Sequence, residues 1–271
     1  MDLQIILVYC LCADLLKGLQ HYEDGQCEMS DAEVMTTAIV AAMFFGCKHE
    51  NACKMLKEQG YIPGMLSKSQ FSRRLHRLDW LLVTLFRTLG EHFKELNPES
   101  IYIIDSAPIA VCDNIRIQRN KIYGDKAHHG YQASKKRYFY GVKIHLLVTK
   151  DHQPVEFFLS PGAFGDVEAL EQFDFDLPEG SQIFADKAYT FHLVEDLMAE
   201  AGIELTPDRK KNSKRPLPPW LQFLLRNYRN QVETAGSLIE RLLPKSIHAV
   251  TAKGFELKVI LFVLASSINC L

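Results

Sequence analysis

The sequence lacks the patterns by which several large classes of protein are recognised. Its seven cysteines form no Cys-x-x-Cys pair and no regular spacing, which favours reduced thiols in a cytoplasmic protein over a disulfide framework or a structural zinc site. There is no phosphate-binding loop, so no nucleotide cofactor is indicated. There is also no Gly-x-Ser-x-Gly elbow, which argues against a serine hydrolase although Ser106 follows Asp105.

Low-complexity tracts and long apolar runs are missing too. The 271 residues are 47% hydrophobic, which indicates a folded globular protein large enough for two domains. Residues 259–268 are apolar but too few to span a membrane. Residues 3–16 have no basic segment before them; Asp2 precedes them, and Asp14 and Lys17 stand within one helical period of each other at their end. We therefore expect an amphipathic packing helix there and not a signal peptide.

The sequence also has no large net charge, since its formal charge is -2. This argues against a uniformly basic nucleic-acid coat, but the charge is unevenly distributed. Between residues 113 and 145 stand Arg116, Arg119, Lys121, Lys126, Lys135, Lys136, Arg137 and Lys143, and a second cluster contains Arg209, Lys210, Lys211, Lys214 and Arg215. Each cluster is either a solvated surface or a patch that binds phosphates.

Residues 1–97 are predicted to be helical. Ser30 and Glu33 form a capping box before the apolar run 34–45. Ser67 or Ser69 is expected to cap a helix over residues 70–78, whose outer face would carry Arg73, Arg74 and Arg77. Such a helix suits either a helix–turn–helix-like unit in a DNA groove or an ordinary charged surface. Residues 97–100 are predicted to end this domain.

From residue 101 onward, the pattern changes to strands alternating with helices. Strands are predicted over residues 101–105, 138–149, 154–159, 182–186 and 203–206, with helices over 167–173, 191–201, 221–243 and 254–268. The fold class is therefore α/β (α+β), with a mixed sheet flanked by helices behind an all-helical N-terminal domain. Ligands are expected at the carboxyl ends of the strands.

Three acidic residues are the main candidates for chemistry. Asp105 and Asp186 each end a short β-branched run, and Glu233 lies in a predicted helix. Each alone is more typical of a cap, a turn or a solvated helix surface. Together, converging carboxylates would repel each other, and a bound divalent cation would neutralise them. Oxygen ligands suit hard cations, and two such cations catalyse phosphodiester hydrolysis and transesterification.

The residues near these carboxylates each have two interpretations. Arg229, one helical turn before Glu233, is a phosphate contact or an intrahelical ion-pair partner. Glu240 is a rival to Glu233 as the third ligand. Lys187 is a phosphate contact or a solvated loop residue. His128 and His129 match no zinc spacing and are predicted to lie in a flexible phosphate-contacting loop.

These carboxylates and basic loops occur in segments that resemble the DDE transposases of bacterial insertion sequences, and in particular the group of such transposases numbered 982. The segments are IIDSAPIAVCDNIR (103–116), KRYFYG (136–141), PVEF (154–157), ADKAY (185–189), NSKRP (212–216), VET (232–234) and IHAVTAKG (247–254). The resemblance covers most of residues 101–271 and, more loosely, the helical part.

The resemblance implies a ribonuclease H-like catalytic domain over residues 98–271, with the C-terminal helix included, and a DNA-end-binding domain over residues 1–97. It implies a metal-binding catalytic triad of Asp105, Asp186 and Glu233, with two Mg²⁺ ions that Mn²⁺ can replace. It also implies that the protein is cytoplasmic, associates with the nucleoid when bound to DNA, and acts as a homo-oligomer on double-stranded DNA. No association with a membrane is expected. The expected DNA contacts are Arg73, Arg74, Arg77, Arg116, Arg119, Lys135, Lys136, Arg137, Lys187, Lys210, Lys211, Lys214, Arg215 and Arg229.

One departure from the family pattern concerns Ala235 and Gly236, which follow Glu233 where a bulkier residue is expected. Glycine inside a helix costs about 1 kcal/mol relative to alanine, which would loosen the third ligand. The expected activity is metal-dependent cleavage and strand transfer of DNA. Two alternatives remain, namely an inactive DNA-binding protein derived from a transposase and a nuclease that cuts without joining.

Overall fold

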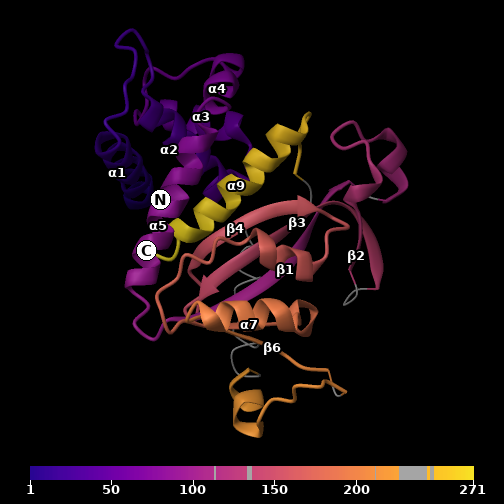
Figure 1. The fold of residues 1–271 in the computed structure, drawn as a ribbon. Helices are drawn as coiled ribbons and strands as arrows, with labels where there is room; N and C mark the ends of the chain where they lie inside the picture. Colours follow the sequence, from indigo (N-terminus) through magenta and orange to yellow (C-terminus); the bar gives the residue numbers. More distant parts are fainter. Residues whose placement is uncertain (113, 133–135, 211, 226–242, 245–246) are drawn as a thin grey trace. The chain divides into compact units, whose positions relative to one another are not determined.

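The computed structural model describes residues 1–271 except 113, 133–135, 211, 226–242 and 245–246. The described helices are α1 (Asp2–Gly18), α2 (Asp31–Phe45), α3 (His49–Glu58), α4 (Lys68–Leu75), α5 (Asp79–Glu95), α6 (Asp166–Ala169), α7 (His192–Glu200) and α9 (Ala252–Ile268). The strands are β1 (Ile101–Cys112), β2 (His129–Gln132), β3 (Arg137–Thr149), β4 (Pro154–Pro161), β5 (Gln182–Ala185) and β6 (Glu204–Pro207). Short 3₁₀ turns lie at η1 (Asn114–Arg119), η2 (Lys126–His128), η3 (Leu170–Gln172) and η4 (Lys187–Tyr189). Figure 1 shows that the N-terminal part of the chain is helical and that strands begin with β1, as the sequence predicted.

The chain divides into two compact units. The helical unit contains Met1–Leu89 and Ile239–Leu271, and the sheet unit contains Gly90–Leu238. This differs from the expected boundary after residue 97, because the last turns of α5 belong to the sheet unit. A Cβ at Gly90 would lie 2.6 Å from the carbonyl oxygen of Val155, so the missing side chain lets the α5 backbone lie directly on β4.

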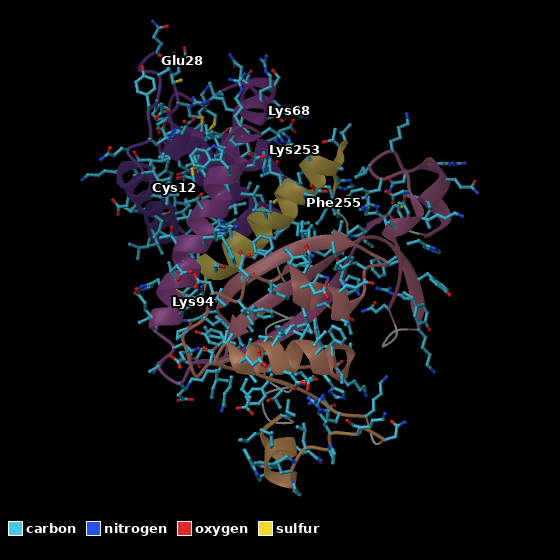
Figure 2. The ribbon with its side chains drawn as sticks, in the orientation of Figure 1. Cys12, Glu28, Lys68, Lys94, Lys253 and Phe255 are labelled. Atoms are coloured by element: carbon cyan, nitrogen blue, oxygen red, sulfur yellow. The ribbon has the colours of Figure 1, made fainter. Side chains whose placement is uncertain are left out.

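The C-terminal helix α9 was expected in the catalytic domain, but it is part of the helical unit. It contacts α2, and both helices are apolar around most of their circumference. A helix of this kind needs partners on several sides and is typically buried. Cys12 of α1 and Phe255 of α9, both labelled in Figure 2, are completely buried.

Local capping explains where the helices of this unit begin. The Ser30 hydroxyl accepts a hydrogen bond from the Glu33 amide, and a Glu33 carboxylate oxygen accepts one from the Ser30 amide, as the sequence predicted. Ser67, one of the two proposed caps, forms a capping box with Gln70 and starts α4. The helix α1 buries Ile5, Val8, Cys12 and Leu16, in agreement with a packing helix.

The strand order of the sheet unit identifies its fold. The described strands form one sheet in the order β2-β3-β1-β5-β6, with β4 also paired to β3. The strands β1, β3 and β4 are antiparallel neighbours, whereas β5 runs parallel to β1 and β6 runs parallel to β5. In chain order, the antiparallel strands β1, β2, β3 and β4 are therefore followed by β5 and β6, which extend the sheet in parallel from β1. This is the ribonuclease H-like arrangement, and it confirms the predicted fold class.

Two details of the sheet differ from the prediction. β1 continues to Cys112, well beyond the expected end at Asp105, because it stays paired with β3 as far as Tyr140. His129 was expected in a flexible loop, but it begins β2, which pairs with the first residues of β3. Among the described helices, none is long and apolar enough to cross a membrane.

Candidate active site at the strand ends

The register of two parallel strands brings Asp105 and Asp186 together. Ile104 of β1 pairs with Ala185, the last residue of β5, so the next residue on each side is an aspartate: Asp105 within β1 and Asp186 directly after β5. Neighbouring strands lie about 4.8 Å apart, and residues in register on parallel strands project to the same face. The two carboxylates predicted from separate segments therefore lie side by side at the carboxyl edge of the sheet.

Local hydrogen bonds fix the orientation of both carboxylates. Oδ1 of Asp105 accepts from the Ser106 amide at 2.8 Å. Oδ1 of Asp186 accepts from the Lys187 amide at 2.6 Å, where Asp186 caps the η4 turn. Both aspartates are half-buried. Two half-buried carboxylates at one edge form an oxygen-rich donor set that suits a hard divalent cation.

A buried polar network lies behind this pair. The Tyr189 side chain is only 1% exposed, and its hydroxyl is 3.5 Å from Nδ1 of His145. Nε2 of His145 lies 2.9 Å from the Ser160 hydroxyl. The network thus connects the turn that follows Asp186 to β3 and β4.

Burial sets the protonation of this network. Burial first, and then the charge of Asp166, raise the pKa of Tyr189 well above its usual value, and the charges of Asp105 and Asp186 add to the effect. Burial lowers the pKa of His145 to about 4. Both side chains are therefore neutral near pH 7, and the Tyr189 phenol keeps its proton as a hydrogen-bond donor.

A second connection passes through Asp166, at the start of α6. Its Oδ1 accepts from the Ser106 hydroxyl at 2.9 Å and from Nζ of Lys143 at 3.2 Å. Lys143 also donates to the Phe164 carbonyl at 2.9 Å. Because Ser106 follows Asp105 directly, the ion pair between Lys143 and Asp166 fixes the part of β1 that carries Asp105.

A third aspartate follows the next strand of the same edge. Ala185 pairs with Pro207 at the end of β6, so Asp208 follows β6 as Asp186 follows β5. The Asp208 amide donates to the Ala185 carbonyl at 2.9 Å. The sequence analysis missed Asp208 as a candidate, although it had predicted the strand over residues 203–206 that precedes it. It missed Asp166, Tyr189 and His145 because no local spacing connects them.

The predicted third ligand lies outside the described residues. Glu233, its rival Glu240, the neighbouring Arg229 and the glycine at 236 all fall within 226–242. Within the described ranges, no group of three His, Cys, Asp or Glu residues could hold a metal ion. His128 instead bonds Asp125 at 2.6 Å and stacks on Tyr123 with ring centroids 3.8 Å apart.

The basic side chains expected to contact DNA fall into three groups. Lys135, Lys211 and Arg229 lie outside the described residues. Two others are engaged by carboxylates, because Arg74 bonds Glu23, Asp31 and the Met29 carbonyl, and Arg215 forms two hydrogen bonds to Asp196 at 2.7 and 3.0 Å. The exposed ones are Arg73, Arg77, Arg116, Arg119, Lys136, Arg137, Lys187, Lys210 and Lys214.

Three of these arginines line a cleft in the helical unit. The cleft has a volume of about 440 Å³, and its wall includes Arg73, Arg74 and Arg77 of the α4 region together with Glu28 and Gln70. Arg74 is half-buried and bonded to the carboxylates of its partners, so its side chain forms a fixed part of the cleft wall. Arg73 and Arg77 remain exposed to solvent.

The strand order and the carboxylate pair define a ribonuclease H-like domain with an acidic edge. The chain belongs to the transposase DDE domain family, whose model matches residues 95–246, more than half of the chain. Among solved structures, it is similar to one described as the cryo-EM structure of the piggyBac transposase synaptic complex with hairpin DNA. That similarity has a TM-score of 0.45 and 10% identity, and it covers 97% of this chain and 70% of the other. No curated protein matches the sequence.

Proposed function

We propose that this transposase binds the inverted-repeat ends of an insertion sequence, cleaves DNA there and joins the freed ends to a target. The observation that supports this best is the position of Asp105 and Asp186 directly after the last residue pair of the parallel strands β1 and β5, Ile104 and Ala185, inside the region that the family model matches. An acidic pair at the carboxyl edge of a ribonuclease H-like sheet is suited to phosphodiester chemistry with divalent ions. Membership of the group numbered 982, and a bacterial cytoplasmic location near the nucleoid, belong to the same proposal.

The three carboxylates Asp105, Asp186 and Glu233 would hold a pair of divalent ions, with Mg²⁺ as the natural choice and Mn²⁺ as a substitute. When bound, such ions stabilise charge on the attacking and leaving oxygens of a phosphodiester. The protein orients the acidic pair through the backbone amides of Ser106 and Lys187. It also holds the segments that follow each aspartate through the Asp166 and Tyr189 networks.

Exposed cations would position DNA around this edge. Lys187 directly follows Asp186 and is exposed, so it is the nearest candidate for a phosphate contact. Arg116 and Arg119 on η1 and Lys210 and Lys214 beyond β6 are further candidates. In the helical unit, Arg73 and Arg77 beside the cleft would bind the backbone of the inverted repeat, and two copies of the chain would act on paired ends.

Replacing Asp105 with asparagine tests the catalytic proposal. Asp105→Asn keeps the shape of the side chain but removes a charge that would hold the ion. We expect cleavage and joining to fall about a thousandfold or more, the equivalent of several kcal/mol, while binding of the end is retained. The assay uses the full chain, Mg²⁺ and a duplex that carries the inverted repeat flanking the gene.

The matched control is Asp151→Asn, which changes an exposed aspartate in the turn between β3 and β4 and should cut normally. An Asp105→Asn protein that still cuts at the normal rate would refute the assignment. An unmodified chain that binds ends but never cuts with Mg²⁺ or Mn²⁺ would favour an inactive DNA-binding protein. Cutting without joining of pre-cut ends would favour a nuclease.

A further inference from the structure

An exposed row of aromatic rings lies on the β2–β3 hairpin of the sheet unit. Tyr131 pairs with Tyr138, and His129 pairs with Tyr140, so these four side chains share one face of the hairpin. Tyr138 lies between two of them, with ring centroids 4.9 Å from Tyr131 and 5.2 Å from His129, the latter pair stacked. Tyr131 is 52% exposed and Tyr138 is 57% exposed.

The opposite face of the hairpin is packed and makes it rigid. Phe139 is 5% exposed, and a Cβ at Gly130 would lie 2.5 Å from its ring and 2.2 Å from the Gly162 carbonyl oxygen. Gly130 is therefore needed for the Phe139 ring and the end of β4 to approach the backbone. One face of the hairpin is therefore packed against the end of β4, and the aromatic row lies on the other face.

The row is covered at one end only. The Tyr140 hydroxyl donates to the carbonyls of Tyr123 and Asp125 at 2.9 and 3.2 Å, which fixes the loop before β2 over that ring. Tyr140 is consequently 4% exposed. The side chains of Tyr131, Tyr138 and His129 are instead exposed to solvent.

Positive charge accompanies the open rings. Lys136 lies just before β3 and two residues from Tyr138, Lys126 lies three residues before His129, and both are exposed. Arg137, the first residue of β3, is exposed too, but strand alternation places it on the Phe139 face. Ring faces beside cations are the features by which proteins hold single-stranded nucleic acid, since bases stack on the rings and phosphates contact the cations. A hydrophobic protein partner would be poorly matched to these charges.

We propose that Tyr131, Tyr138 and His129 form a stacking surface for unpaired DNA bases, with Lys136 and Lys126 contacting the adjoining phosphates. The ligand is single-stranded DNA, such as the strand left unpaired at a cut or melted end. This rests on the proposed function for its biological setting, but it concerns a site separate from the carboxylate edge. The simpler account is a cross-strand aromatic pair that only stabilises the hairpin, and the test separates the two.

The experiment measures equilibrium binding of the full chain to three fluorescein-labelled probes by anisotropy. The probes are a thymidine oligomer of about a dozen nucleotides, within the usual range of single-strand site sizes, an abasic oligomer of equal length, and the matching duplex. The abasic oligomer keeps the phosphates but has no bases to stack. The unmodified chain should bind the thymidine oligomer more tightly than the abasic one.

Tyr131→Thr and Tyr138→Thr remove the rings while keeping strand-forming residues. We expect each to weaken binding of the thymidine oligomer about tenfold and to leave the abasic oligomer unchanged. Tyr138→Phe retains the ring and should bind normally. Lys136→Ala should weaken the binding of all three probes. Tyr22→Ala, at a tyrosine that is 87% exposed in the helical unit, should change the binding of none.

Equal affinity of the unmodified chain for the thymidine and abasic oligomers would overturn the proposal. So would threonine variants that bind both oligomers normally, or that weaken both equally. A change in mass by light scattering without a change in oligomer binding would point to a protein interface instead. Because no cleavage is measured, failure of the Asp105→Asn prediction would leave this result intact, and the reverse also holds.

Discussion

Tyr189 connects the two halves of the candidate site at the scale of single residues. It lies three positions after Asp186, is buried, and reaches His145 with its hydroxyl at 3.5 Å. A hydrogen bond with Ser106, the residue after Asp105, partly opposes the rise in the pKa of its phenol. The side chain is therefore coupled to the segments that carry both aspartates, and we assign it a positioning role.

Removing only the hydroxyl tests that role. Tyr189→Phe keeps the ring and leaves polar groups of the network without their partner, so we expect a loss of stability of about 1–3 kcal/mol. If the network positions the aspartates, half-maximal cleavage should also require several times more Mg²⁺. The measurements are urea unfolding and cleavage rate against Mg²⁺ concentration.

The matched control is Tyr140→Phe, another buried tyrosine of the sheet unit, whose hydroxyl bonds the carbonyls of Tyr123 and Asp125 away from the carboxylate edge. It should lose similar stability without a change in Mg²⁺ dependence. If Tyr189→Phe also leaves the Mg²⁺ dependence unchanged, its role is structural only.

At the scale of elements, sequence patterns predicted what depends on neighbouring residues. The apolar runs before Asp105 and Asp186, and the capping box at Ser30, are local signals, and the structure has strands and a helix there. The continuation of β1 past Asp105 was missed, because its pairing with β3 involves residues far away in the chain. Pro108 discourages a strand prediction because proline has no amide hydrogen to donate. It is tolerated here because β1 extends beyond the end of β5, so this part of β1 is an edge on that side.

The site shows the same division. The position of Asp105 and Asp186 at neighbouring strand ends follows from two strand predictions, whereas the contacts of Asp166 and Tyr189 come from several elements with no common spacing. Arg74 is another case of a distant contact, since the sequence shows a basic helix face but not that Asp31, 43 positions earlier, binds this guanidinium. Glu233 stays a prediction because it lies outside the described residues.

The contact of α5 with β4 yields a prediction about an element. A Cβ at Gly90 would lie 2.6 Å from the Val155 carbonyl oxygen and 3.3 Å from its Cα, and both are backbone atoms that cannot turn aside. We expect Gly90→Ala to destabilise the protein by about 1–3 kcal/mol, as overpacking usually does. Thermal unfolding followed by circular dichroism measures the change.

Gly18→Ala is the matched control, because Gly18 also lies in a helix but nothing stands within 4 Å of the added Cβ. The higher helix propensity of alanine should leave stability unchanged or raise it by up to about 1 kcal/mol. A Gly90→Ala protein as stable as Gly18→Ala would show that α5 can move away from β4 at little cost.

At the scale of the whole molecule, the helical unit is assembled from both ends of the chain. It contains residues from Met1 to Leu89 and from Ile239 to Leu271, and α9 contacts α2 across more than two hundred positions of sequence. Compact units of this kind often open as separate cooperative blocks. If these two do so, damage to α9 should spread to α2 and not to the sheet.

Leu261→Ala in α9 and Leu147→Ala in β3 provide matched tests, because both leucines are completely buried and each change should cost about 2–5 kcal/mol. In native-state hydrogen exchange followed by mass spectrometry, Leu261→Ala should lower protection in peptides of α2 and α9 together and leave β1 and β3 unchanged. Leu147→Ala should do the reverse. Equal loss of protection in all four elements in both variants would mean that the two units unfold as one.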